Sequence, residues 1–259
     1  MTINRIFVIA KNVFQEVVRD RILYIIGFYT LIFGVSLRVL PEFAASTENK
    51  MLLDFGMVAM SVIILIVTIF IGTGLINKEI EKRTILVLVA KPISRSEIIT
   101  GKFLGLSAVI AVLVTSMTGI YLLFLQIANI PHPTVSILIA AVFLFLQLSL
   151  IAAVAITFGV FTSSLLAIVL TFAVYLMGNI TQDLVQFGRL SHNPIIQIFA
   201  QILYLILPDL SRLDLKNDAV YGLHALPDFT ALTINLGYGL IYSVMLLAIA
   251  IFIFSRREF

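Results

Sequence analysis

The sequence predicts an all-α integral membrane protein with six transmembrane helices. Of its 259 residues, 61% are hydrophobic and 12% are charged, whereas soluble domains carry about 25% charged residues. Long apolar runs alternate with polar segments, and the basic residues are spread unevenly among those segments. The sequence contains no cysteine, which excludes disulfides and thiolate metal sites. No basic tract interleaved with aromatic residues occurs, so no nucleic-acid partner is predicted.

Residues 1–21 are predicted to form an amphipathic helix that lies in the membrane interface. Their apolar side chains recur at helical spacing, and charged and amide side chains occupy the other side. The alternative is a short helix that packs against other parts of the protein. Lys11 interrupts the apolar run, so the segment does not have the pattern of a cleavable signal peptide.

The six predicted spans follow in order, because crossing a hydrocarbon core of about 30 Å takes about 20 helical residues. Arg38 is the one charged residue within them, and it lies near a span end. A further apolar stretch at 195–207 would make a helix of only about 20 Å, so it is predicted to be interfacial or re-entrant. The six spans are 22–40, 57–75, 103–128, 135–161, 164–180 and 231–254.

The distribution of basic residues predicts the topology. With six spans and both termini in the cytoplasm, the cytoplasmic segments hold most of the lysines and arginines, as the positive-inside rule requires. The chain is therefore predicted to be a multi-pass protein of the cell membrane, surrounded by lipid. Segment 78–102 is then cytoplasmic, and loop 181–230 is extracytoplasmic. Three scattered histidines in outer segments share no metal-ligand spacing, so no metal site is predicted.

The segment between the second and third spans has an ordered composition. An acidic pair, Glu79 and Glu81, leads into an apolar run, and Pro92 then breaks the helix. Ser94 and Glu97 have the spacing of a capping box that starts a new helix. The predicted result is a cytoplasmic helix–break–helix element of mixed charge, suited to a soluble partner. The alternative is a solvated basic loop that only fixes topology.

This segment resembles the corresponding one in the membrane subunits of type-2 ABC transporters. Those subunits commonly read E-x-E-x-G-T, then a proline eight residues after the threonine, then x-S-R and a G-K pair that opens the next span. Arg83 stands where many members have glycine. The sequence of the segment most resembles the subgroup that contains the permease of nitrous-oxide-reductase maturation systems. The matching positions are Glu79, Glu81, Thr84, Pro92, Ser94, Arg95, Gly101 and Lys102.

The resemblance implies a coupling helix that docks on a separate ATP-binding subunit. ATP and Mg²⁺ would bind to that ATPase, and this chain would bind no cofactor of its own. It also implies a pair of permease subunits, either a homodimer or two related chains, and the subgroup implies an extracytoplasmic protein partner at loop 181–230. The residues implied at or near the ATPase contact are Glu79, Glu81, Thr84, Lys91, Pro92, Ser94 and Arg95.

Other features limit the function further. The chain lacks a G-x-x-x-x-G-K-[ST] phosphate loop, so it is predicted to be a transport subunit and not an enzyme. The spans carry little charge, which favours export of an amphipathic or hydrophobic substrate over an ion relay. Gly72, Gly74, Gly101 and Lys102 are predicted to act in a hinge or in helix packing. Gln147, Asn179 and Asn235 are the notable polar groups within the spans, where interhelical hydrogen bonds are their ordinary role.

Three other classes of function compete with this one. A non-transporting scaffold that anchors a cytoplasmic partner would use the same charged segment and is the main alternative. An intramembrane enzyme would need a catalytic constellation at membrane depth, which the spans do not contain. A secondary transporter is disfavoured because inverted repeats and charged membrane residues are missing from the sequence.

Overall fold

The computed structural model describes residues 2–20, 22–43, 48–81, 94–190 and 194–256. Every regular element in these ranges is helical, which confirms the all-α class. The elements are α1 (Thr2–Asp20), α2 (Ile22–Phe43), α3 (Glu48–Glu81), α5 (Arg95–Ile127), α6 (Thr134–Phe161), α7 (Ser164–Asn179), α8 (Thr181–Leu190), α9 (Pro194–Ile206), the 3-10 helix η1 (Leu210–Leu213), α10 (Lys216–Val220) and α11 (Phe229–Arg256).

Five helices are long and apolar enough to cross a membrane, namely α2, α3, α5, α6 and α11. Helix α7 has only 16 residues, and it forms a sixth candidate span together with α8, from which it is bent by 59°. The count of six spans and their sidedness therefore stay predictions. Helices α3 and α5 extend well beyond the predicted spans, because hydropathy marks only the apolar part of a helix whose polar ends also fold.

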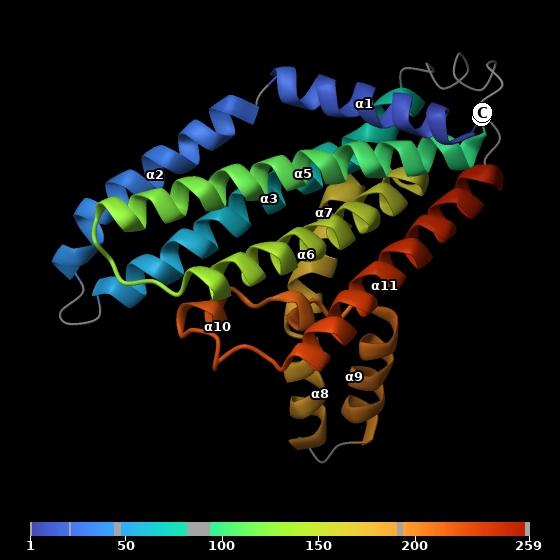
Figure 1. Cartoon of the computed structure of the whole chain (residues 1–259). Helices are drawn as coiled ribbons and strands as arrows, with labels where there is room; N and C mark the ends of the chain where they lie inside the picture. Colours follow the sequence, from blue (N-terminus) through green and yellow to red (C-terminus); the bar gives the residue numbers. More distant parts are fainter. Residues whose placement is uncertain (1, 21, 44–47, 82–93, 191–193, 257–259) are drawn as a thin grey trace.

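Helix α6 is the most deeply buried span and lies among α3, α5 and α11 (Figure 1). Small residues allow its neighbours to approach closely. A Cβ placed on Gly72 of α3 would lie 2.8 Å from the Cβ of Ala155, and one on Gly159 would lie 3.1 Å from the carbonyl oxygen of Thr73. Lipid tails are as apolar as the helices, so close packing of this kind is what holds spans together in a bilayer.

Helix α1 packs against the first half of α5 (Figure 1). Val13 is buried there, whereas Ile3 and Phe7 stay exposed. The predicted amphipathic helix therefore forms, and it has an extensive contact within the protein. Its place at the membrane interface stays a prediction.

Residues 181–228, here called the outer region after the side predicted for them, are more structured than the expected loop 181–230 suggested. Helices α8 and α9 lie side by side and project from the rest of the bundle, at the bottom of Figure 1. Helix α9 coincides with the predicted short helix at 195–207, whereas α8, η1 and α10 were not anticipated. The 3-10 helix packs on α6 and α7, and α10 packs on α6 and α3.

Candidate functional site

The start of α5 carries the predicted capping box. The Glu97 backbone N–H donates to Ser94 Oγ at 3.2 Å, and the Ser94 backbone N–H donates to Glu97 Oε2 at 2.8 Å. These bonds satisfy two backbone donors that a helix start otherwise leaves unpaired. Glu97 is buried despite its charge. The second half of the predicted helix–break–helix element is therefore a helix with a capped N-terminus.

Arg95 joins this helix start to the end of α11. Its Nη1 donates to the carbonyl oxygen of Phe254, and its guanidinium lies 5.5 Å from the centroid of the Phe254 ring. Phe254 is in the last turn of α11, where carbonyl groups lack intrahelical partners and carry the negative end of the helix dipole. A cation is therefore well placed at this helix end.

Lys102 joins α5 to α3. Its side chain is buried, and its Nζ donates to the carbonyl oxygen of Leu75. Beside it, Gly101 and Gly105 form the contact with α1. A Cβ on Gly101 would lie 2.8 Å from the Cβ of Ile9, so glycine is required for this close approach.

The structure describes only part of the predicted coupling site. Glu79 and Glu81 lie in the last turn of α3, and the placement of their side chains is not described. Thr84, Lys91 and Pro92 lie outside the described residues. Ser94 and Arg95 lie together at the start of α5. A role in contacting an ATPase stays a prediction for all seven residues.

The glycines of the second span were predicted to act in a hinge or in packing. Gly72 and Gly74 are both buried in α3, and Gly72 faces α6. Gly101 faces α1. The contacts of Gly72 and Gly101 are those that the packing alternative requires, and the hinge role stays a prediction.

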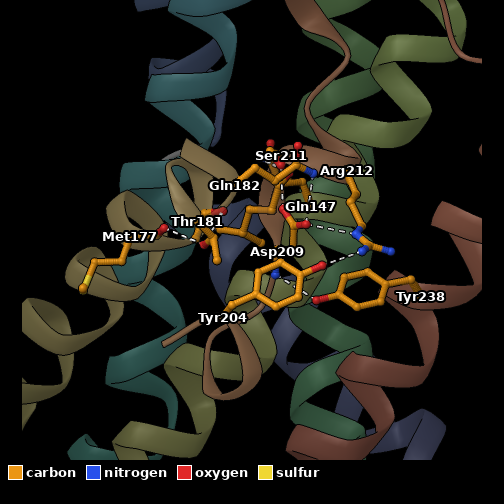
Figure 2. A network of polar contacts seen from close by, with 11 residues as sticks. Gln147, Met177, Thr181, Gln182, Tyr204, Asp209, Ser211, Arg212 and Tyr238 are labelled. Atoms are coloured by element: carbon orange, nitrogen blue, oxygen red, sulfur yellow. Dashed lines mark hydrogen bonds and ion pairs between the residues drawn. The ribbon is translucent and has the colours of Figure 1, made fainter. Parts of the chain in front are cut away.

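A second cluster of polar residues lies in the outer region, and Figure 2 shows that it centres on Asp209. The Asp209 carboxylate is 3% exposed and pairs with Arg212 Nε at 3.0 Å. It also accepts hydrogen bonds from Gln182 Nε2 at 3.1 Å and from Ser211 Oγ at 2.5 Å. The hydrogen bond to Asp209 raises the pKa of Arg212 above its ordinary value, so the guanidinium stays protonated.

Two tyrosines extend this cluster to α9 and α11. Arg212 Nη2 donates to Tyr204 Oη at 2.8 Å. The backbone N–H of Asp209 donates to Tyr238 Oη at 2.8 Å, and the Arg212 guanidinium lies 5.1 Å from the Tyr238 ring centroid. The cluster therefore connects α8, α9 and α11 through the short turn at η1.

Gln147 and Asn179 connect the outer cluster to the buried span. Gln147 is 2% exposed, and its Nε2 donates to Asn179 Oδ1 at 3.2 Å and to the carbonyl oxygen of Leu210 at 3.3 Å. These bonds join α6 to α7 and to η1, which is the interhelical role expected for buried amides in spans. Asn235 lies in α11.

Sequence reasoning missed the residues of the outer cluster. Asp209 and Arg212 have the i, i+3 spacing of an ion pair on one helical turn, which is the one local signal available. Their partners Gln182, Tyr204 and Tyr238 come from three other helices, and only the fold brings them together.

Comparison with known proteins places the chain in a family. Residues 7–259 match the family described as ABC-2 family transporter protein. No curated protein matches the chain. Because the family match covers nearly the whole sequence, it includes the apolar spans, the segment after α3 and the outer helices together. The chain thus belongs to the ABC-2 family of transporter proteins, and it is a multi-pass membrane component of an ABC transporter.

Proposed function

We propose that this chain is the permease subunit of an ABC exporter, driven by a separate ATPase that docks on segment 78–102 from the cytoplasm. The observation that carries the proposal is the way the described ends of this segment are held. Lys102 ties α5 to α3, and Arg95 ties α5 to α11. A force applied to the segment would therefore reach three helices at once.

Helix α1 would take part in the same movement. The close contacts of Gly101 and Gly105 with α1 leave no space for independent sliding, since a Cβ on Gly105 would lie 2.7 Å from the carbonyl oxygen of Ala10. Docking and release of the ATPase would then shift α1, α3, α5 and α11 as a group, together with α6, which lies among α3, α5 and α11. Opening a path between such groups in two paired permease subunits is the alternating movement that export requires.

The substrate proposed is amphipathic or hydrophobic. Among the described residues, the buried charged side chains are Glu97 and Lys102 at the start of α5 and Asp209 in the outer cluster. The middle of the described spans thus offers no buried acid for a proton or sodium relay. An apolar path fits a molecule that already partitions into lipid.

The sequence of residues 78–105 also supports assigning the chain to the subgroup that contains the nitrous-oxide-reductase maturation permeases. In that case an extracytoplasmic protein partner is expected at residues 181–230, where α8 and α9 project from the bundle.

The test is charge reversal of the acidic pair at the start of segment 78–102. A tagged Glu79→Lys/Glu81→Lys variant is purified in mild detergent from its host beside the unchanged protein, and the proteins that accompany each are identified. We expect a companion with a phosphate-loop motif to be lost from the variant, because the complementary charge at the docking surface is inverted.

The matched control is Glu42→Lys/Asp183→Lys, which reverses two exposed acids of other segments. It should keep the companion at the level of the unchanged protein. If the Glu79/Glu81 variant keeps both its companion and nucleotide-dependent transport, segment 78–102 is not the docking site.

A further inference from the structure

An open groove between α5 and α6 has no role in the proposed function. The two helices lie side by side (Figure 1), and the groove has a volume of about 490 Å³. It is lined by residues 111–122 of α5 and residues 138–145 of α6, of which Leu138 and Val142 are exposed. Both helices are long and apolar enough to cross a membrane. In a multi-pass membrane protein, this groove therefore opens toward hydrocarbon.

The groove occupies the half of both spans that adjoins the α5–α6 turn. Leu122 lies five residues before the end of α5, and Leu138 lies four residues after the start of α6. From Leu122 to Ala111 the helix rises about 16 Å, and the hydrocarbon of one leaflet is about 15 Å deep. The groove therefore has the length of one leaflet.

Helix α11 closes the inner end of the groove. Phe145 and Ile156 lie on one face of α6, because eleven residues make about three helical turns. Ile156 is buried in a cluster with Leu247 and Ala250 of α11. No side chain of residues 143–160 is exposed. An occupant therefore enters beside the α5–α6 turn or from the surrounding lipid, and it ends near the middle of the spans.

The lining of the groove is neutral and almost entirely apolar. None of the ten lining residues is charged, and Thr115 and Thr118 are the two that carry a hydroxyl. Thr118 donates to Met60 Sδ at 3.5 Å, inside the bundle. Thr115 can bond the carbonyl oxygen four residues earlier in its own helix, as Thr73 does with Ile69. The groove therefore requires no polar partner and favours hydrocarbon.

The size of the groove fits one hydrocarbon chain and not a second protein. A stable protein interface buries about 800 Å² and about 20 residues on each side, whereas this groove has ten lining residues. Broader apolar faces for pairing lie on α2 and α11, the least buried of the five long spans. A cavity of about 150 Å³ holds one benzene molecule, so by the same ratio the groove has room for roughly 20 carbon atoms.

We propose that the α5–α6 groove holds one acyl chain of a membrane glycerolipid, drawn from the leaflet at the α5–α6 turn. The length, volume and apolar lining of the groove fit such a chain, and α11 stops the chain near the middle of the bilayer. Residues 123–137, beside which the headgroup lies, contain no lysine, arginine, aspartate or glutamate. The chain is therefore recognised, and the charge of the headgroup is not.

Filling the groove with a side chain tests the proposal. In Gly119→Leu the new side chain enters the groove, and a Cβ at Gly119 meets no atom within 4 Å. Gly27→Leu is the matched control, because Gly27 of α2 has equally open surroundings and lies outside the groove.

The measurement counts the lipids that stay bound. Each full-length protein is reconstituted in nanodiscs of palmitoyl-oleoyl phosphatidylcholine and extracted in mild detergent, and the retained lipids are counted by native mass spectrometry. We expect the unchanged protein and Gly27→Leu to retain one lipid that Gly119→Leu loses. Phosphatidylglycerol with the same chains should be retained equally, whereas dihexanoyl phosphatidylcholine should be lost, because its chains are too short to fill the groove.

Photolabelling locates the chain in the unchanged protein. A phosphatidylcholine with a diazirine at the end of one chain should label residues 111–115 and 141–145, at the closed end of the groove. Labelling confined to other segments would overturn the proposal, whether or not Gly119→Leu folds.

Three further results would overturn the proposal. Equal lipid retention by the two glycine variants would mean that the lipid binds elsewhere. Retention of phosphatidylglycerol alone would mean that a headgroup is recognised. The sequence has no cysteine, so a disulfide-linked dimer of Thr115→Cys would mean that a second copy of the chain occupies the groove.

Discussion

The contact between α1 and α5 can be tested with a single methyl group. In Gly105→Ala, the new Cβ would lie 2.7 Å from the carbonyl oxygen of Ala10 and 2.8 Å from the Cβ of Val13. Both distances are well below ordinary van der Waals contact, so α1 must move away. Overpacking of this kind typically costs about 1–3 kcal/mol.

A second effect opposes the clash. Alanine favours a helix interior over glycine by about 1 kcal/mol. The net change for Gly105→Ala is therefore a destabilisation of about 0–2 kcal/mol, by the same two values. At Gly119, on the same helix, a Cβ would have no atom within 4 Å. Gly119→Ala should then show only the helix-propensity gain, so the two variants should differ by about 1–3 kcal/mol.

The assay compares thermal unfolding of the two variants in detergent with amide hydrogen exchange of residues 2–20. We expect Gly105→Ala to unfold at a lower temperature than Gly119→Ala and to exchange faster in α1, because α1 is the helix displaced. If the two variants are equally stable and exchange in α1 is unchanged, α1 does not pack on α5 as described.

Two further substitutions probe the ends of the bundle. Ser94→Ala should lower the free energy of unfolding by about 1 kcal/mol, the usual value of a lost N-cap, whereas Glu97→Gln keeps a side-chain acceptor and should lower it clearly less. Chemical unfolding monitored by circular dichroism measures both changes, and equal losses would contradict the capping box. Asp209→Asn should lower the free energy of unfolding by about 2 kcal/mol, because the charge-assisted bond from Arg212 is weakened in a buried site. Amide hydrogen exchange should become faster in residues 194–206, since Tyr204 is held through Arg212. Unchanged exchange there would show that the outer cluster does not hold α9.

The features predicted correctly from sequence are those that depend on neighbouring residues. Ser94 and Glu97 are three positions apart, so the capping box could be recognised without knowledge of the fold. The five long spans follow from continuous apolar runs, whose composition alone distinguishes them. Helix α9 was anticipated because two prolines bound a short apolar stretch.

The features that were missed depend on the fold. Helix α8 mixes polar and apolar residues in a short segment, so neither hydropathy nor length marks it. The partner of Gly101 is Ile9, which lies far earlier in the chain, on the first helix. Gln182 and Tyr204 meet the Asp209–Arg212 pair only because α8, α9 and η1 converge. No local pattern encodes such a meeting.

The basic residues around the coupling segment differ from its acids in what they can do. Arg95 and Lys102 bond backbone carbonyls of α11 and α3, so their charges contribute to joining helices within the chain. In the proposed arrangement, substituting either one would weaken the connection between the docked ATPase and the bundle. Glu79 and Glu81, at the end of α3, lie on the segment that would face that partner in the proposed arrangement. Recognition of the ATPase and transmission of its movement would thus reside in different residues of one short segment, and the two functions could be impaired separately.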